Sequence, residues 1–121
     1  MKRDMDIVRA ILVVVETQEA GVHISGVPTV GEASAETVAE HIRIMKDADL
    51  LYAEVIGSSD QGYVVHIFGL TWKGHDFLES VRNDTVWQKV CGKIKDVGAG
   101  MTIELVKELA TSYLKEMLQL K

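Results

Sequence analysis

The hydrophobic pattern of this sequence changes its period near Leu50. Over residues 34–48, apolar residues recur at three- and four-residue spacing, which predicts a helix that begins at Ser34. Residues 50–56 and 63–68 are predicted to be strands, and the polar, glycine-bounded segment between them is predicted to be a hairpin loop. The chain therefore contains a helix that leads directly into a β-hairpin.

Further helices are predicted on both sides of this hairpin. They cover residues 4–19, a segment from Thr71, a segment from Asn83-Asp84, and residues 102–120. Residues 21–33 hold three glycines and the only proline, which predicts a loop with a short strand at Val22–Ile24. We expect an α+β, mostly helical fold: a winged helix with a two-stranded wing, the helix at 34–48 in the place of the recognition helix, and extra C-terminal helices. Residues 1–98 would form the winged-helix domain. Residues 99–121 would form a C-terminal helix, either part of the same domain or a dimerisation element.

Composition points to a soluble protein of one domain's size. The chain has 121 residues, of which 47% are hydrophobic, and no stretch approaches the roughly 18 apolar residues of a membrane span. Lys2 and Arg3 are followed at once by acids, without the cleavage site of a secretory signal. The single Cys91 excludes an internal disulfide and agrees with a reducing compartment. We therefore expect a cytoplasmic protein without a membrane partner.

The charge distribution weakens a DNA-binding hypothesis. Residues 1–84 carry seven basic and fourteen acidic side chains, whereas nucleic-acid binding usually leaves a basic footprint. The helix at 34–48, with Asp49 after it, has a net charge of −2, and the wing tip at 58–61 has no Lys or Arg. The candidate DNA-contacting residues, should DNA be bound, are Thr37, His41, Arg43 and Lys46.

No catalytic, cofactor or metal site is predicted. The four histidines do not have the spacing of a metal-binding pair, and Cys91 lies fifty residues beyond His41. The sequence has neither a phosphate-binding glycine motif nor a serine nucleophile elbow. We therefore expect a protein that is not an enzyme.

Two segments make the chain similar to a known family. One is the opening Met1–Arg9, and the other is Leu-Thr-Trp-Lys-Gly-His-Asp-Phe-Leu at 70–78, continued to Trp87 by a segment containing Arg-Asn-Asp-Thr-Val-Trp. They resemble a family of short bacterial and phage-borne proteins known as a domain of unknown function. The resemblance covers nearly the whole chain and implies a winged-helix fold and a phage, prophage or bacterial origin, but no activity. The second motif begins with Leu70, Thr71 and Gly74. This Leu-Thr-x-x-Gly pattern resembles the start of the helix that follows the wing in winged-helix regulators.

The second motif is interpreted first as a packing and capping unit. Thr71 would cap its helix, and Gly74 suggests the close approach of another backbone. Phe77 would join the two tryptophans in one aromatic cluster. The alternative is a partner surface, and the candidate residues for either role are Trp72, His75, Asp76 and Trp87.

Three functions are compatible with these observations. The first is a protein-binding accessory factor that contacts a host or phage protein, and the second is a small DNA-binding transcriptional regulator. A DNA mimic is the weakest, since acids on a small protein usually serve solubility. We also expect a homodimer through the last helix, whose apolar stripe is wider than one docking face needs. The candidate dimer residues are Leu105, Leu114 and Leu118.

Overall fold

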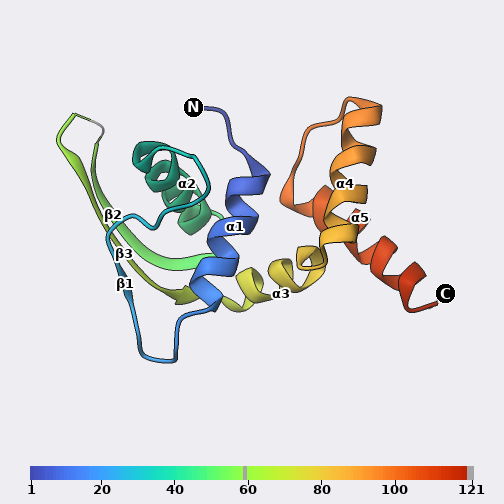
Figure 1. Cartoon of the computed structure of the whole chain (residues 1–121), viewed down its shortest axis with the longest axis horizontal. Coiled ribbons are helices and arrows are strands. Elements are labelled where there is room, and N and C mark those ends of the chain that lie inside the picture. Colours follow the sequence, from blue (N-terminus) through green and yellow to red (C-terminus); the bar gives the residue numbers. More distant parts are fainter. Residues whose placement is uncertain (59, 120–121) are drawn as a thin grey trace. The chain divides into compact units, whose positions relative to one another are not determined.

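The computed structural model describes residues 1–58 and 60–119 of the chain. Within these residues it contains five helices and a small three-stranded sheet (Figure 1). The elements are α1 (Met5–Glu16), β1 (Ile24–Ser25), α2 (Ala35–Asp47), β2 (Leu51–Ser58), β3 (Gly62–Leu70), α3 (Trp72–Val81), α4 (Asp84–Val97) and α5 (Ile103–Met117). The predicted α+β class and the order of the elements are confirmed. Residue 120, where the last helix was predicted to end, lies outside the described residues.

Four helices begin at a residue whose side chain caps the first turn. The side-chain oxygens of Asp4, Ser34, Asn83 and Thr102 each accept a hydrogen bond from a backbone N–H of the turn that follows. Such caps satisfy N–H groups that have no partner within the helix. The predicted starts of these helices are therefore confirmed by contacts that are local in the sequence.

The sheet is antiparallel, in the order β1-β3-β2. β2 and β3 form a hairpin with a β-bulge between Tyr52 and Ala53. The short strand β1 pairs with the other edge of β3, with Ile24 opposite Ile67 and Ser25 opposite His66. Gly57 has a φ of 105°, and a Cβ at this position would overlap the carbonyl oxygen of Gly62. The hairpin therefore needs glycine where the chain turns back.

One face of the sheet packs against α1 and α2, which lie together on that side (Figure 1). The side chains that point inward from the two helices and the two long strands are almost fully buried. They include Val8, Ile11, Leu12, Val38, Ile42, Met45, Ala53, Val65 and Ile67. The hydrophobic core of the N-terminal part thus lies between the helices and one face of the sheet.

The turn between α2 and β2 is held by the start of α3. The Thr71 hydroxyl donates to the Asp49 carbonyl at 2.5 Å and accepts from the Gly74 N–H at 2.9 Å. The Thr71 N–H donates to the Leu50 carbonyl at 3.1 Å. A Cβ at Gly74 would overlap that carbonyl oxygen. The predictions that Thr71 is a cap and that another backbone approaches Gly74 closely are both confirmed.

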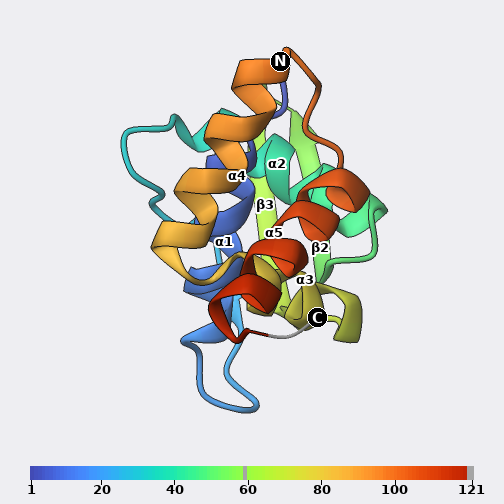
Figure 2. The same ribbon diagram turned by 90° about the vertical axis from the view of Figure 1, so that its right-hand side faces the viewer.

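The chain forms two compact units, Met1–His75 and Asp76–Lys121. The division falls inside α3, whereas the sequence placed a boundary at residue 98. In the second unit α4 packs against α5, and Figure 2 shows the two helices next to each other. Gly98 ends α4 in the left-handed conformation, with a φ of 69°. Because α5 folds onto α4, the last helix joins its predecessor in one unit.

Candidate functional site

The outer face of the sheet carries exposed apolar side chains. Tyr52 and Ile56 on β2 are 60% and 63% exposed, and Val64 and Phe68 on β3 are 55% and 44% exposed. Side chains alternate between the two faces of a strand, so these four point away from α1 and α2. We call the outward residues of β2 and β3 the outer face: Tyr52, Glu54, Ile56, Val64, His66 and Phe68.

Residues on and just before β1 support one edge of the outer face. The His23 ring lies edge-on to Phe68, with ring centroids 4.9 Å apart and an interplanar angle of 86°. The Ser25 hydroxyl lies 3.5 Å from Nδ1 of His66. These contacts hold two side chains of β3 in place and add polar groups beside the apolar ones.

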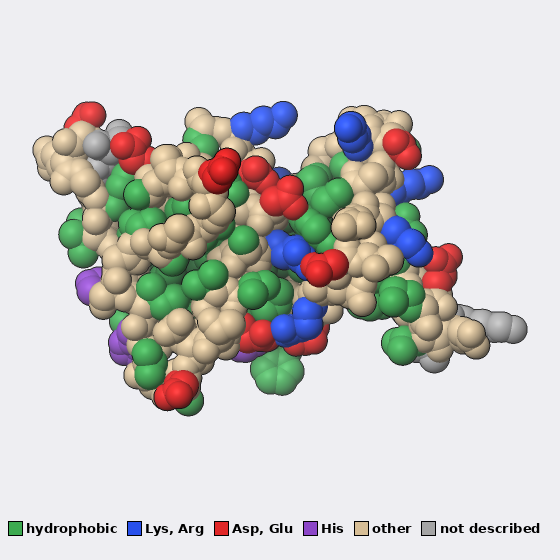
Figure 3. All heavy atoms as spheres, viewed as in Figure 1, with side chains coloured by type: hydrophobic (Ala, Val, Ile, Leu, Met, Phe, Trp, Pro, Cys, Tyr) green, Lys and Arg blue, Asp and Glu red, His purple; other side chains and the backbone are tan. Residues whose placement is uncertain are grey.

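The charges near the outer face are few. Glu54 pairs with His66 across the two strands, and the outer face as defined here includes no lysine or arginine. In Figure 3, hydrophobic and histidine side chains gather along the left edge, over the sheet, and no lysine or arginine side chain is visible there. The N-terminal unit as a whole carries six basic and eleven acidic side chains. This surface therefore lacks the positive charge that phosphate contacts require.

One candidate for DNA contact, His41, is fully buried, which corrects the expectation that it is exposed. Its Nε2 accepts a hydrogen bond from the Asp4 N–H at 2.9 Å, and its Nδ1 lies 2.8 Å from the Thr37 carbonyl. A carbonyl can only accept, so Nδ1 carries the proton and the ring is neutral. His41 therefore links the start of α1 to α2 and cannot reach a ligand.

A second candidate, Arg43, is held by the hairpin. Its Nη2 donates to the Gly57 carbonyl at 2.9 Å, and its Nε lies 3.4 Å from Oε2 of Glu40. The Tyr63 hydroxyl donates to Oε1 of the same Glu40 at 2.9 Å. Burial raises the pKa of the Tyr63 phenol, and the hydrogen bond to Glu40 and its negative charge raise it further. This cluster fastens α2 to the hairpin.

The two remaining candidates on α2 differ in exposure. Thr37 is half-buried, and its hydroxyl accepts a hydrogen bond from the Ser34 hydroxyl at 2.9 Å. Lys46 is exposed in the last turn of α2. At the predicted wing tip, Asp60 and Gln61 are exposed, and residue 59 lies outside the described residues. The four candidates therefore do not form one exposed surface.

The candidate residues of the second family motif, which runs from Leu70 to Trp87, also differ in exposure. Trp72 is 82% exposed, whereas Phe77 and Trp87 are almost fully buried. The predicted three-residue aromatic cluster is therefore wrong, because the first position of α3 turns its ring to solvent. His75 and Asp76 are exposed. Trp72, His75 and Asp76 are therefore accessible to a partner, whereas Trp87 is buried.

The candidate dimer helix exposes its apolar residues mainly at its end. Leu118, just after α5, is 68% exposed, and the neighbouring Met117 is half-exposed. Leu105 and Leu114 are half-buried. The exposed apolar surface of α5 is therefore smaller than the sequence pattern indicated.

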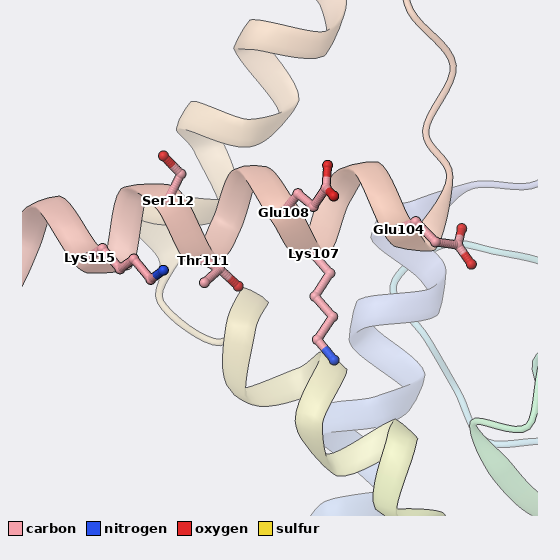
Figure 4. Close-up of a pocket in the computed structure, with 6 residues that line it drawn as sticks. All are labelled: Glu104, Lys107, Glu108, Thr111, Ser112 and Lys115. Carbon is pink, nitrogen blue, oxygen red and sulfur yellow. The ribbon is translucent and has the colours of Figure 1, made fainter. Parts of the chain in front are cut away.

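A hollow of about 540 Å³ runs along α5. Its six lining residues are Glu104, Lys107, Glu108, Thr111, Ser112 and Lys115. Figure 4 shows that Glu108 and Ser112 project to one side of the helix and Lys107 to the other. Side chains that diverge in this way, with both signs of charge, do not converge on a ligand.

Two kinds of feature are absent from the part of the chain that the structure describes. No group of three or more His, Cys, Asp or Glu side chains there is placed to hold a metal ion. In the same part of the chain, no helix is long and apolar enough to cross a membrane.

Sequence reasoning did not single out the outer face. The alternation in β3 places Val64, His66 and Phe68 on one face and Tyr63, Val65 and Ile67 on the other, so both faces contain apolar residues. Which face the helices cover depends on contacts between distant segments. The available signal was the set of apolar residues on both faces of a hairpin, which is more than one buried face requires.

Comparison with known proteins places the chain in a family. No solved structure matches it significantly. A protein of Haemophilus influenzae, described as an uncharacterized protein, is 33% identical over 119 residues, which cover 98% of this chain and 99% of that protein. Residues 2–101 match the family described as "Hypothetical protein (DUF2513)". The expected resemblance to a family of unknown function is thereby confirmed, and the chain belongs to the DUF2513 family.

Proposed function

We propose that this chain is a non-enzymatic protein-binding accessory factor of bacterial or phage origin, acting in the cytoplasm, and that the outer face is its binding surface. The observation that carries this proposal is the group of four large apolar side chains exposed together on one side of a sheet. They form two apolar rows with Glu54 and His66 between them, and apolar side chains gathered on one exposed face mark interaction sites in soluble proteins more strongly than single exposed residues do. A protein partner is the class of ligand that such a surface fits.

The contacts of α2 support a protein partner over DNA. A recognition helix needs free basic side chains to contact phosphates and base edges. Here Arg43 is committed to Gly57 and Glu40, and His41 is buried. Lys46 is then the basic residue of α2 that remains for such contacts. It lies in a unit that has more acidic than basic side chains.

We assign the N-terminal unit to the winged-helix class on its topology. β1 lies between α1 and α2 in the chain and pairs with β3, while β2 and β3 form the hairpin in the place of the wing. Between α1 and α2 the structure has only β1 and turns, so the middle helix of a helix-turn-helix is missing. A missing middle helix also removes the support that would direct α2 into a DNA groove.

A pull-down tests the protein-binding proposal. The tagged chain is incubated with nuclease-treated lysate beside a double variant, Ile56→Glu with Phe68→Glu, and a control, Met117→Glu, which places the same charge at an exposed apolar position of α5. We expect proteins captured by the parent to be lost with the double variant and retained with the control. Equal capture by all three would refute the role of the outer face.

A DNA titration tests the alternative. We expect labelled duplex DNA to bind weakly and without sequence preference at roughly physiological salt, because an acidic unit releases few counterions. Submicromolar binding to one particular sequence would replace the proposal with a DNA-binding regulator.

A further inference from the structure

We propose that the outer face binds the outer face of a second copy of this chain, so that two sheets pack face to face about a two-fold axis. This inference rests on the proposed function, because it uses the same surface and names its partner. It moves the expected homodimer contact from α5 to the sheet.

The outer face consists of three rows across β2 and β3. Ile56 pairs with Val64 in the first row, and Glu54 pairs with His66 in the second. Beyond the bulge, Tyr52 and Phe68 form the third row, since Tyr52 pairs with Gly69, which follows Phe68 in the chain. A polar row thus lies between two apolar rows, with the acid on β2 and the histidine on β3.

This pattern is complementary to itself in one orientation. A two-fold axis parallel to the strands places β2 of one copy over β3 of the other. Glu54 then faces His66 of the second copy, and Ile56 faces Val64 of the second copy. Face-to-face sheets pack about 10 Å apart with interdigitated side chains, so these residues would meet.

The alternative, a two-fold axis between the sheets that runs perpendicular to the strands, is unfavourable. A two-fold axis perpendicular to the strands places Glu54 over Glu54 of the second copy. Two carboxylates in a desolvated interface repel each other, and such like-charge contacts select against an arrangement. The charges of the outer face therefore select the parallel axis, in which each acid meets a histidine and each apolar row meets its counterpart.

The face is also ordered before association. The His23 ring fixes Phe68 from the side, and the Ser25 hydroxyl lies beside His66. Side chains that are already held lose less conformational entropy on binding. An isologous contact of this kind uses the same surface on both copies and closes a dimer.

A charge-swap experiment tests the inference in the full-length chain. Glu54→Lys and His66→Glu are made as separate variants, and sedimentation equilibrium is measured for each alone and for an equimolar mixture. We expect the parent to dimerise in the micromolar range. Each variant alone should dimerise at least about tenfold more weakly, because Glu54→Lys loses both contacts between a carboxylate and an imidazole, and His66→Glu places two pairs of carboxylates against each other. The mixture should recover, since the new lysine faces the new glutamate while one native Glu54–His66 contact remains.

Two controls keep the result interpretable. Leu118→Glu places a charge at the exposed end of α5 and should leave the dimer intact. Far-UV circular dichroism of each variant shows whether it is folded. If a charge-swap variant does not fold, Ile56→Lys replaces it, because Ile56 is 63% exposed and a charge there should abolish the dimer without disturbing the chain.

The outcomes separate this inference from the proposed function. A parent chain that stays monomeric in the micromolar range overturns the second copy as partner, whereas a face-dependent capture in the pull-down would still support protein binding. A dimer that survives both charge swaps but dissociates in Leu118→Glu also overturns the inference and places the contact on α5. Failure of the mixture to recover, with both variants folded, refutes the face-to-face arrangement.

Discussion

Replacing Gly74 by alanine should destabilise the N-terminal unit, although alanine is the better helix former. The added Cβ would overlap the Leu50 carbonyl oxygen and lie 3.1 Å from its carbon. Both are backbone atoms at the turn between α2 and β2, so no flexible side chain can move aside. The first turn of α3 must therefore shift away from Leu50.

The magnitude follows from what that shift would break. Three hydrogen bonds join Thr71 and Gly74 to each other and to the Asp49–Leu50 turn, and each is worth about 1 kcal/mol. Forcing a methyl group into a filled site costs a further 1–3 kcal/mol or so. The helix propensity of alanine returns about 1 kcal/mol. We expect a net loss near 4 kcal/mol, which lowers the Tm of a chain this size by about 15 °C.

Gly92 provides a matched control. It also lies within a helix, α4, and nothing lies within 4 Å of a Cβ built there. Gly92→Ala should therefore stabilise the chain by up to about 1 kcal/mol. Urea and thermal unfolding followed by circular dichroism compare the two variants with the parent. If Gly74→Ala is as stable as Gly92→Ala, the close approach to Leu50 does not constrain the fold.

Three further changes have expected outcomes. Phe77→Ala should cost about 3–5 kcal/mol because the ring is buried, and a variant that melts within a few degrees of the parent would show otherwise. The raised pKa of Tyr63 means that its bond to Glu40 stabilises the fold fully below pH 10 and less as the pH rises through the raised value. Tyrosinate absorbance should therefore show one late-titrating tyrosine that Tyr63→Phe removes, and unchanged curves would contradict it. His41→Phe should cost about 1–3 kcal/mol and speed hydrogen exchange of the Asp4 amide, which loses its acceptor; unchanged exchange would refute this link.

The starts of the helices could be predicted from the sequence because their causes are local. Asp4, Ser34, Asn83 and Thr102 each bond to a backbone N–H two or three residues ahead. Thr71 and Gly74 were also recognisable, since a cap and a helical glycine are visible as residue types. The segment that approaches Gly74 was not.

Side-chain exposure was harder to predict because it depends on distant segments. His41 was expected to be exposed, yet its ring is fully buried and accepts a hydrogen bond from the backbone N–H of Asp4, 37 positions earlier. Trp72 was expected in an aromatic cluster, yet it projects into solvent. Hydrophobic periodicity assigns a residue to one side of an element, but it does not state which side the rest of the chain covers.

The division of the chain inside α3 has a consequence for its synthesis on the ribosome. The contacts that define the N-terminal unit all lie at or before His75. Domains fold as units from the N-terminus during translation, so the sheet and its two covering helices can form before the C-terminal unit has left the ribosome. Nascent chains would then display the outer face. If that face binds a second copy, as we propose, two chains growing on neighbouring ribosomes of one messenger RNA would meet through it before either is released.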